Sequence, residues 1–101
     1  MAYEVRVSQS AERDLNEILQ YITVSLFEPV AAGRFLKSIE ECYKQLSSNP
    51  FVYALSSDNR LQDEGYRKVV IGKYLLMFTV EEKVVFVHRI FYGARDYSKF
   101  L

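Results

Sequence analysis

The sequence contains one cysteine, two prolines, four glycines and no tryptophan. The single cysteine, Cys42, excludes an internal disulfide, and a domain this small without disulfides fits a reducing compartment. No apolar run approaches the roughly 18–20 residues of a membrane-spanning helix. The first seven residues alternate apolar and charged side chains, so they lack the apolar segment of a signal peptide. We therefore expect a cytoplasmic protein that does not associate with membranes.

Clustered metal ligands and phosphate-binding loops are also missing. Cys42 and His88 are the only strong soft ligands, and they do not have the spacing of a zinc site. The four glycines are scattered, which excludes a glycine-rich phosphate loop. No Gly-x-Ser-x-Gly motif accompanies His88, so a nucleophile triad has little support. We expect no metal and no cofactor, and we expect Cys42 to be a buried structural residue on an apolar helix face.

Apolar residues make up 50% of the 101 residues, which is enough to form a core, and we expect residues 1–101 to form one domain. The net charge is zero, which gives no support for tight phosphate binding. Residues 1–59 hold five basic and eight acidic side chains, a net charge of −3. Residues 60–101 hold eight basic and five acidic side chains, a net charge of +3. This asymmetry indicates either a face for an anionic partner or a solvated strand surface.

Hydrophobic periodicity predicts a strand, two helices and three further strands. Residues 3–7 alternate as a half-buried strand does, and a first helix then follows that ends near Leu26. A second helix has Pro29 in its first turn and ends before Asn49-Pro50. The short link between the two helices predicts an antiparallel hairpin. Residues 51–65 predict a polar loop, and residues 66–71, 74–80 and 84–92 predict strands joined by short turns.

This order of elements predicts the fold class α+β. The N-terminal strand and the three C-terminal strands should form one largely antiparallel sheet, with the helical hairpin on one face. The other face is expected to be open and partly polar, which makes it a natural binding surface. Strand alternation divides residues 84–92 between the two faces: Val85, Val87, Arg89 and Phe91 on one, and Phe86, His88, Ile90 and Tyr92 on the other.

Several polar side chains in the C-terminal strands have more than one interpretation. His88 is either a half-buried structural residue or an acid/base group on the open face. Arg89 either pairs with a carboxylate of the helix layer or the tail, or faces an anionic partner. Arg95 suits a phosphate or a carboxylate, or it forms a surface cluster with Asp96. Four basic residues would form a patch near one end of the sheet: Arg67, Lys68, Lys73 and Arg95.

Tyrosines near this basic patch also have two interpretations. Tyr66, Tyr74 and Tyr92 would allow RNA to be held by charge and base stacking together. Tyrosines at strand spacing are more often simply core or half-core residues.

Two segments resemble the RelE/ParE superfamily of toxins. Residues 66–80 resemble the R-x-x-x-V-G-x-Y-h-h-h-Y-x-V core of these proteins, and residues 87–97 resemble their h-x-R-h-h-x-G-x-R-D signature. The N-terminal strand, a helix containing Asp14 and a second helix ending at Asn49-Pro50 extend the resemblance over essentially the whole chain. It implies a growth-inhibiting toxin of a bacterial type II toxin–antitoxin system, of the kind linked to plasmid stabilisation. The resemblance also implies a cognate antitoxin that wraps the toxin, with operator DNA bound only through that antitoxin.

Two activities occur within this superfamily. RelE-type members cut messenger RNA in the ribosomal A site without a metal, and ParE-type members poison DNA gyrase. A ribonuclease would use Arg67, His88, Arg95 and Tyr97 as catalytic residues. Partner binding would use Lys68, Lys73, Arg89 and Arg95.

Departures from RelE favour the ParE type. Val69 and Leu75 stand where RelE has basic residues, and Leu101 stands at the position of its C-terminal tyrosine. The Arg89…Gly93-x-Arg95-Asp96 pattern is also more similar to ParE. We therefore expect a ParE-like toxin that acts on DNA gyrase. The alternatives are a ribosome-dependent mRNA endonuclease and a member that binds a partner without toxicity.

Overall fold

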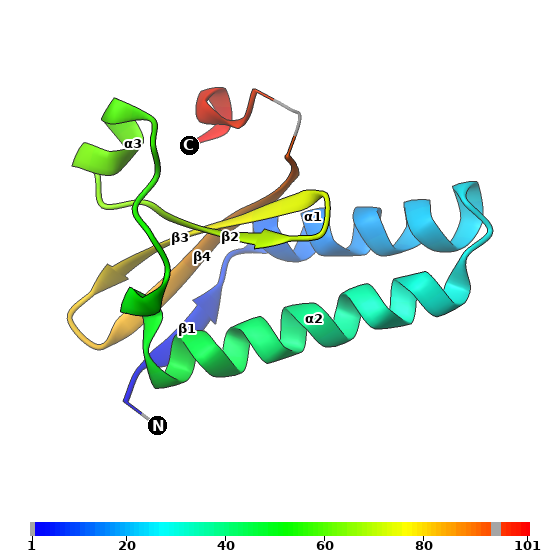
Figure 1. The fold of residues 1–101 in the computed structure, drawn as a ribbon, viewed down its shortest axis with the longest axis horizontal. Helices are drawn as coiled ribbons and strands as arrows, with labels where there is room; N and C mark the ends of the chain where they lie inside the picture. Colours follow the sequence, from blue (N-terminus) through cyan, green and yellow to red (C-terminus); the bar gives the residue numbers. More distant parts are fainter. Residues whose placement is uncertain (1, 94–95) are drawn as a thin grey trace.

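The computed structural model describes residues 2–93 and 96–101 and contains one sheet with a helical hairpin against it (Figure 1). The strands are β1 (Glu4–Val7), β2 (Arg67–Ile71), β3 (Tyr74–Glu81) and β4 (Val84–Tyr92). The α-helices are α1 (Gln9–Gln20), α2 (Pro29–Ser48) and α3 (Asn59–Asp63). A π-helical turn, Tyr21–Ser25, continues α1, and 3₁₀ turns form at Pro50–Val52 and Tyr97–Phe100. Within the described residues, no helix is both long and apolar enough to cross a membrane.

The strand order β1-β4-β3-β2 confirms the predicted α+β sheet. β1 runs parallel to β4, and the other two pairings are antiparallel. The last paired residue of β1 is Val7, opposite Val87. Ser8 then donates from its backbone N to the oxygen of Val87 and from its hydroxyl to the oxygen of His88. β1 and Ser8 therefore cover only the first part of the outer edge of β4.

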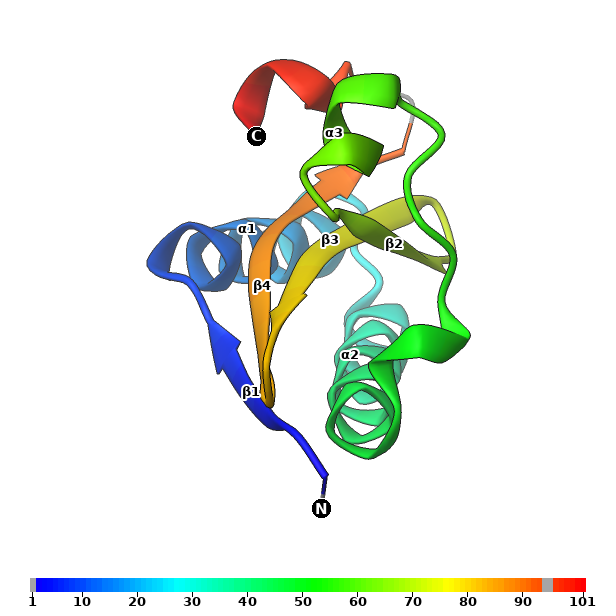
Figure 2. The same ribbon diagram turned by 90° about the vertical axis from the view of Figure 1, so that its left-hand side faces the viewer.

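The helical hairpin covers one face of this sheet (Figure 2). The Ser8 hydroxyl accepts from the backbone N of Ala11 and caps α1, because the first amides of a helix have no partner within it. Pro29 occupies the first turn of α2, and Asn49 ends the helix in an extended conformation before Pro50. Residues that are fully buried on both layers form the main core, among them Ala11, Ile39, Leu46, Leu76, Phe78 and Val85.

A β-bulge in β4 corrects the faces predicted from strict alternation. Phe78 pairs with Val87 while Met77 pairs with Arg89, so His88 is an extra residue opposite β3. Ile90 consequently joins the core beneath the helices, and Phe91 packs with Met77 on the opposite face. The prediction placed these two residues the other way round. It was wrong because the bulge shifts the alternation by one residue.

The face predicted to be open is partly covered by α3 and the C-terminal 3₁₀ turn, which lie together on the side away from the hairpin (Figure 2). Leu61 of α3 is fully buried with Met77 and Phe91, and Tyr66, Tyr97 and Leu101 pack against this second cluster. Arg60 joins the two segments by donating to the Ser98 oxygen over 2.7 Å. Residues 51–65 were predicted as a loop. They contain α3 because the Asp58 carboxylate caps it, accepting from the Leu61 nitrogen, and because Leu61 has a buried site to fill.

Candidate functional site

His88 lies half-buried at the bulge, on the face that carries α3. Its Nε2 is 2.8 Å from the Thr79 hydroxyl, and its ring centroid is 5.0 Å from that of Tyr66. Burial lowers the pKa of His88 below the usual 6.5, and the charge of Glu81 offsets only part of this effect. The imidazole is therefore mainly neutral near pH 7, with one nitrogen already bonded to Thr79.

Arg67 lies on the other face of the sheet. It is in register with Phe78, whose side chain is in the core beneath the helices. Its guanidinium donates to the Tyr53 oxygen over 2.7 Å and lies 5.0 Å from the ring centroid of Phe51. The structure therefore does not bring Arg67 and His88 together.

Arg89 forms a bidentate ion pair with Asp14 of α1. Nε donates to Oδ2 over 2.7 Å, and a terminal nitrogen donates to Oδ1 over 3.0 Å. The pair is largely shielded from solvent and raises the pKa of Arg89, mainly because the guanidinium donates hydrogen bonds to the Asp14 carboxylate. The guanidinium also lies 4.7 Å from the Phe91 ring and 5.6 Å from the Phe100 ring. Of the two interpretations of Arg89, the structure shows the carboxylate pair.

The remaining predicted residues that the structure describes are dispersed. Lys68 is half-buried and in register with Met77, and Lys73 is exposed in the β2–β3 turn. Tyr97 stacks on Phe91 at a centroid distance of 6.1 Å and so belongs to the second apolar cluster. Arg95 lies outside the described residues.

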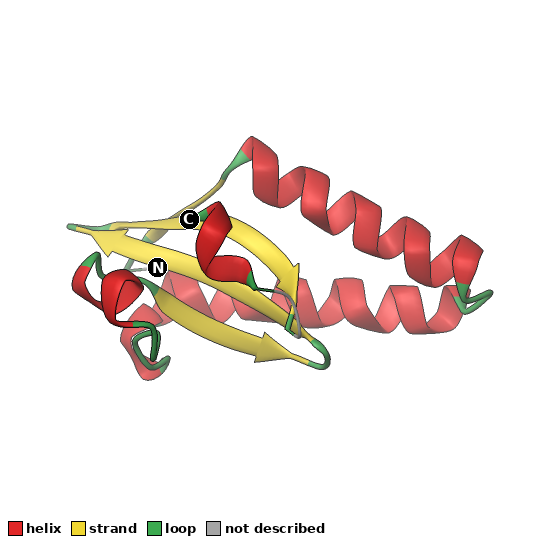
Figure 3. Ribbon diagram, turned by 90° about the horizontal axis from the view of Figure 1, so that it is seen from above, coloured by secondary structure: helices red, strands yellow, loops and turns green. Residues whose placement is uncertain are grey.

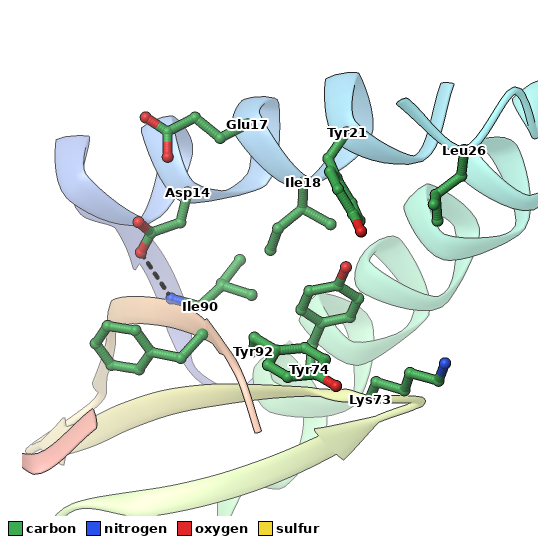
Figure 4. A pocket seen from close by; sticks show the side chains of 10 residues that line it. Asp14, Glu17, Ile18, Tyr21, Leu26, Lys73, Tyr74, Ile90 and Tyr92 are labelled. Carbon is green, nitrogen blue, oxygen red and sulfur yellow. Dashed lines mark hydrogen bonds between the residues drawn. The ribbon is translucent and has the colours of Figure 1, made fainter. Parts of the chain in front are cut away.

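A groove of about 620 Å³ lies between α1 and the end of the β3–β4 pair (Figure 4). Apolar and aromatic side chains line most of it, and its charged lining residues are acidic on α1 and basic in the β2–β3 turn. The lining residues are Asp14, Glu17, Ile18, Tyr21, Leu26, Lys73, Tyr74, Ile90, Phe91 and Tyr92. The sequence predicted that Tyr74 and Tyr92 lie near Lys73. It contained no signal for the opposite wall on α1, because that contact joins segments far apart in the chain.

Three tyrosines come together in this groove. The rings of Tyr74 and Tyr92 meet edge to face at 5.9 Å. Burial raises the pKa of the Tyr74 phenol, and the neighbouring phenols of Tyr21 and Tyr92 raise it further. The groove therefore offers aromatic surface with hydroxyl groups along it, a combination common at protein interfaces.

The outer edge of β4 borders the same groove. The Gly93 nitrogen donates to the Lys73 oxygen, and Ile90 and Tyr92 pair with Leu76 and Tyr74. In an antiparallel ladder this register turns the backbone groups of Ile90 and Tyr92 away from β3. The Ile90 nitrogen donates to the Asp14 carboxylate over 2.9 Å. Tyr92 lies two residues after Ile90 in β4, and its backbone N–H and C=O groups also point away from β3, toward the groove.

Metal binding and thiol chemistry receive no support from the described residues. They contain no group of three or more histidine, cysteine or acidic side chains arranged to hold a metal ion. Cys42 is buried, and burial raises the pKa of its thiol to about 11. A thiol with such a pKa is protonated and unreactive at neutral pH.

Comparison with known proteins gives one family match. Residues 5–97 match the family described as the ParE toxin of the type II toxin-antitoxin system, parDE. No curated protein matches the sequence.

Solved structures share the fold. A chain of the chromosomal ParDE TA system from P. aeruginosa superposes with a TM-score of 0.72 at 22% identity, covering 90% of this chain and 96% of that one. A chain of the toxin-antitoxin complex RelBE2 from Mycobacterium tuberculosis gives 0.62 at 20% identity, covering 91% and 99%. YafQ from E. coli strain BL21(DE3) gives 0.57 at 16% identity, covering 91% and 94%. At these identities the likeness shows a common fold.

Proposed function

The chain belongs to the family of ParE toxins of type II toxin–antitoxin systems, and from this premise we propose that it arrests growth by binding and poisoning DNA gyrase. In this proposal the toxin is a non-catalytic binder. Its cognate antitoxin holds it inactive, and operator DNA is reached only through that antitoxin.

The positions of two arginines are the observation that carries this proposal. A metal-free ribonuclease needs several basic groups that converge on one phosphate to stabilise its developing charge. Arg67 is held by the Tyr53 oxygen on the helix side of the sheet, and Arg89 is paired with Asp14. The opposite face carries an apolar cluster around Met77 instead. Arginines that are already bonded within the fold and do not converge on one site disfavour cleavage of RNA, which leaves binding of a protein as the favoured function.

The groove beside α1 supports a bound antitoxin. It combines apolar walls, exposed tyrosines and a free strand edge, which together suit a polypeptide segment. Two of the similar structures are described as a ParDE TA system and a toxin-antitoxin complex. We therefore assign the antitoxin to this groove in the proposal.

The alternative function is a ribosome-dependent mRNA endonuclease. His88 favours it, because a mainly neutral imidazole on the sheet face is able to accept a proton near pH 7. Lys68 lies on the same side, in register with Met77. Arg95 and Tyr97 would complete the set that the resemblance implies.

Brief induction in bacteria, followed by mapping of RNA 5′ ends, separates the two functions. We expect intact transcripts, growth arrest and DNA damage, together with gyrase-dependent DNA cleavage by the purified toxin in vitro. New RNA ends in phase with codons would overturn the gyrase proposal and establish the ribonuclease. Intact transcripts with normal growth would refute both activities.

The variant Arg95→Ala provides a second test of the ribonuclease alternative. A ribonuclease would lose cleavage while the variant still folds and binds the antitoxin. Asp14→Ala, which breaks a structural pair, serves as the matched control for loss of fold.

A further inference from the structure

The groove beside α1 carries opposite charges on two of its walls. Glu17 projects from α1 at the end of the groove near Asp14, and Lys73 projects from the β2–β3 turn at the opposite end (Figure 4). Both side chains are exposed. A ligand that fills the groove therefore meets a negative charge on one side and a positive charge on the other.

Asp14 does not add to this pattern, although it lines the groove. Its two oxygens accept from Arg89 and from the Ile90 nitrogen, so its charge is already neutralised within the fold. Among the described residues, by contrast, no salt bridge involves Glu17 or Lys73, and the charge of Glu17 acts on Arg89 only from a distance, as a minor cause of its raised pKa. These two charges remain available to a partner.

The space between them is apolar and aromatic. Ile18, Leu26 and Tyr74 form its walls, and Tyr21 and Tyr92 are each about half exposed, at 51% and 50%. Exposed tyrosines gathered in a groove are typical anchors for protein partners. The outward backbone of Tyr92 adds hydrogen-bonding groups that an extended polypeptide satisfies and that a purely apolar ligand leaves unpaired.

We propose that the groove selects its antitoxin by charge order: it accepts a segment with an apolar centre, a basic side chain toward Glu17 and an acidic side chain toward Lys73. This proposal rests on the function proposed above. The apolar centre supplies affinity, and the two flanking charges reject segments in which either charge has the wrong sign. Glu17 and Lys73 are thus determinants of antitoxin specificity, and the fold does not depend on them.

Three synthetic peptides test the charge order. They share a centre of leucine, valine and tyrosine and differ only in their flanks, which are lysine with glutamate, lysine on both sides, or glutamate on both sides. Binding is measured by fluorescence anisotropy at low salt to the wild-type protein, Glu17→Lys, Lys73→Glu and the control Glu40→Lys, whose exposed charge lies on α2 away from the groove.

We expect each protein to prefer the peptide that complements it. The wild type and Glu40→Lys favour the mixed peptide, Glu17→Lys favours the acidic one, and Lys73→Glu favours the basic one. Each preference should be about fivefold and should weaken with salt, as for exposed charge pairs. Equal binding of all three peptides by the wild type would overturn the proposal.

Co-purification with the product of the neighbouring reading frame separates this proposal from the function on which it rests. If that product binds the wild type but binds Glu17→Lys and Lys73→Glu equally well, the charge order is refuted and the toxin–antitoxin pair stands. If it binds none of these proteins, the proposed antitoxin partnership itself fails.

Discussion

At the scale of single residues, the Asp14 carboxylate joins α1 to the bulged part of β4. It accepts two hydrogen bonds from Arg89 and one from the backbone of Ile90. The side chains of Asp14 and Arg89 are only 11% and 22% exposed, so solvent replaces these bonds poorly. This carboxylate takes the place of the strand neighbour that β4 loses where β1 ends.

Removing this carboxylate should therefore destabilise the fold. We expect Asp14→Ala to lower the free energy of unfolding by about 2–3 kcal/mol, because Arg89 and the Ile90 amide both lose their partner. Asp14→Asn retains an acceptor and should cost less. Urea unfolding measures both, with the exposed Glu17→Ala as control. A loss in Asp14→Ala no larger than in Glu17→Ala would show that the pair does not stabilise the fold.

His88 should make stability depend on pH. Its pKa in the folded state lies below the usual 6.5, so the folded state binds fewer protons than the unfolded state as the pH falls through that value. The stabilisation is complete above 6.5 and decreases as the pH falls toward the lowered pKa. Urea unfolding at about pH 7.5 and about pH 5.5, on either side of the usual histidine pKa, measures this decrease.

The control for this pH effect is His88→Gln, whose amide retains a hydrogen bond to Thr79. Its stability should fall less between the two pH values than that of the wild type. An equal fall in both proteins would assign the pH dependence to other groups.

Sequence alone identified these residues but not their partners. From the sequence, the partner of Arg89 was either a carboxylate of the protein or an external anion. Asp14 lies 75 residues away, and nothing local in the sequence indicates the contact. Sequence alone also placed Arg67 and its neighbour Lys68 together in one basic patch. Arg67 pairs with Phe78 across β2 and β3, so its side chain lies on the helix side of the sheet. This pairing exists only in the assembled sheet and is not visible in the sequence.

At the scale of elements, the helical hairpin and the three C-terminal strands were predictable because their periodicity is strong. The bulge was not, since Ile90 and Phe91 are both apolar and either one is compatible with the core. α3 was also missed, because its five residues are too few to show a helical period. Its formation depends on the Asp58 cap and on the buried site that Leu61 fills.

Two glycines in these elements should respond in opposite directions to alanine. Gly72 has φ +59° in the β2–β3 turn, a conformation that alanine adopts only with strain, so Gly72→Ala should destabilise by about 1 kcal/mol. Gly33 lies within α2 with no atom within 4 Å of an added Cβ, so Gly33→Ala should stabilise by about 0.5–1 kcal/mol. Thermal unfolding of both variants checks the signs. Stabilisation by Gly72→Ala would contradict this account of the turn, and destabilisation by Gly33→Ala would contradict the account of the helix.

At the scale of the whole molecule, the helical hairpin projects beyond the end of the sheet (Figure 3). Its far end therefore lacks a second layer to cover its apolar side chains. Val24, Phe27 and Val30 are 58%, 85% and 70% exposed, and Leu26 beside them reaches the groove. Sequence predicted the hairpin but not this overhang, because helix length alone does not show where the sheet ends. These residues form an exposed apolar patch at the hairpin end, as is found at sites of association.

Phe27 should contribute to this association at a cost to stability. It has φ +53°, where asparagine is tolerated far better than an aromatic residue, so Phe27→Asn should stabilise the fold by about 0.5–1 kcal/mol. The same change removes the most exposed apolar side chain of the hairpin end and should reduce self-association of the free toxin. Urea unfolding and sedimentation velocity over a concentration series measure the two effects.

Val52→Asn, which removes an exposed apolar residue away from the hairpin end, should leave self-association unchanged. If Val52→Asn reduces it as much as Phe27→Asn does, the association is driven by general surface hydrophobicity rather than by the hairpin end.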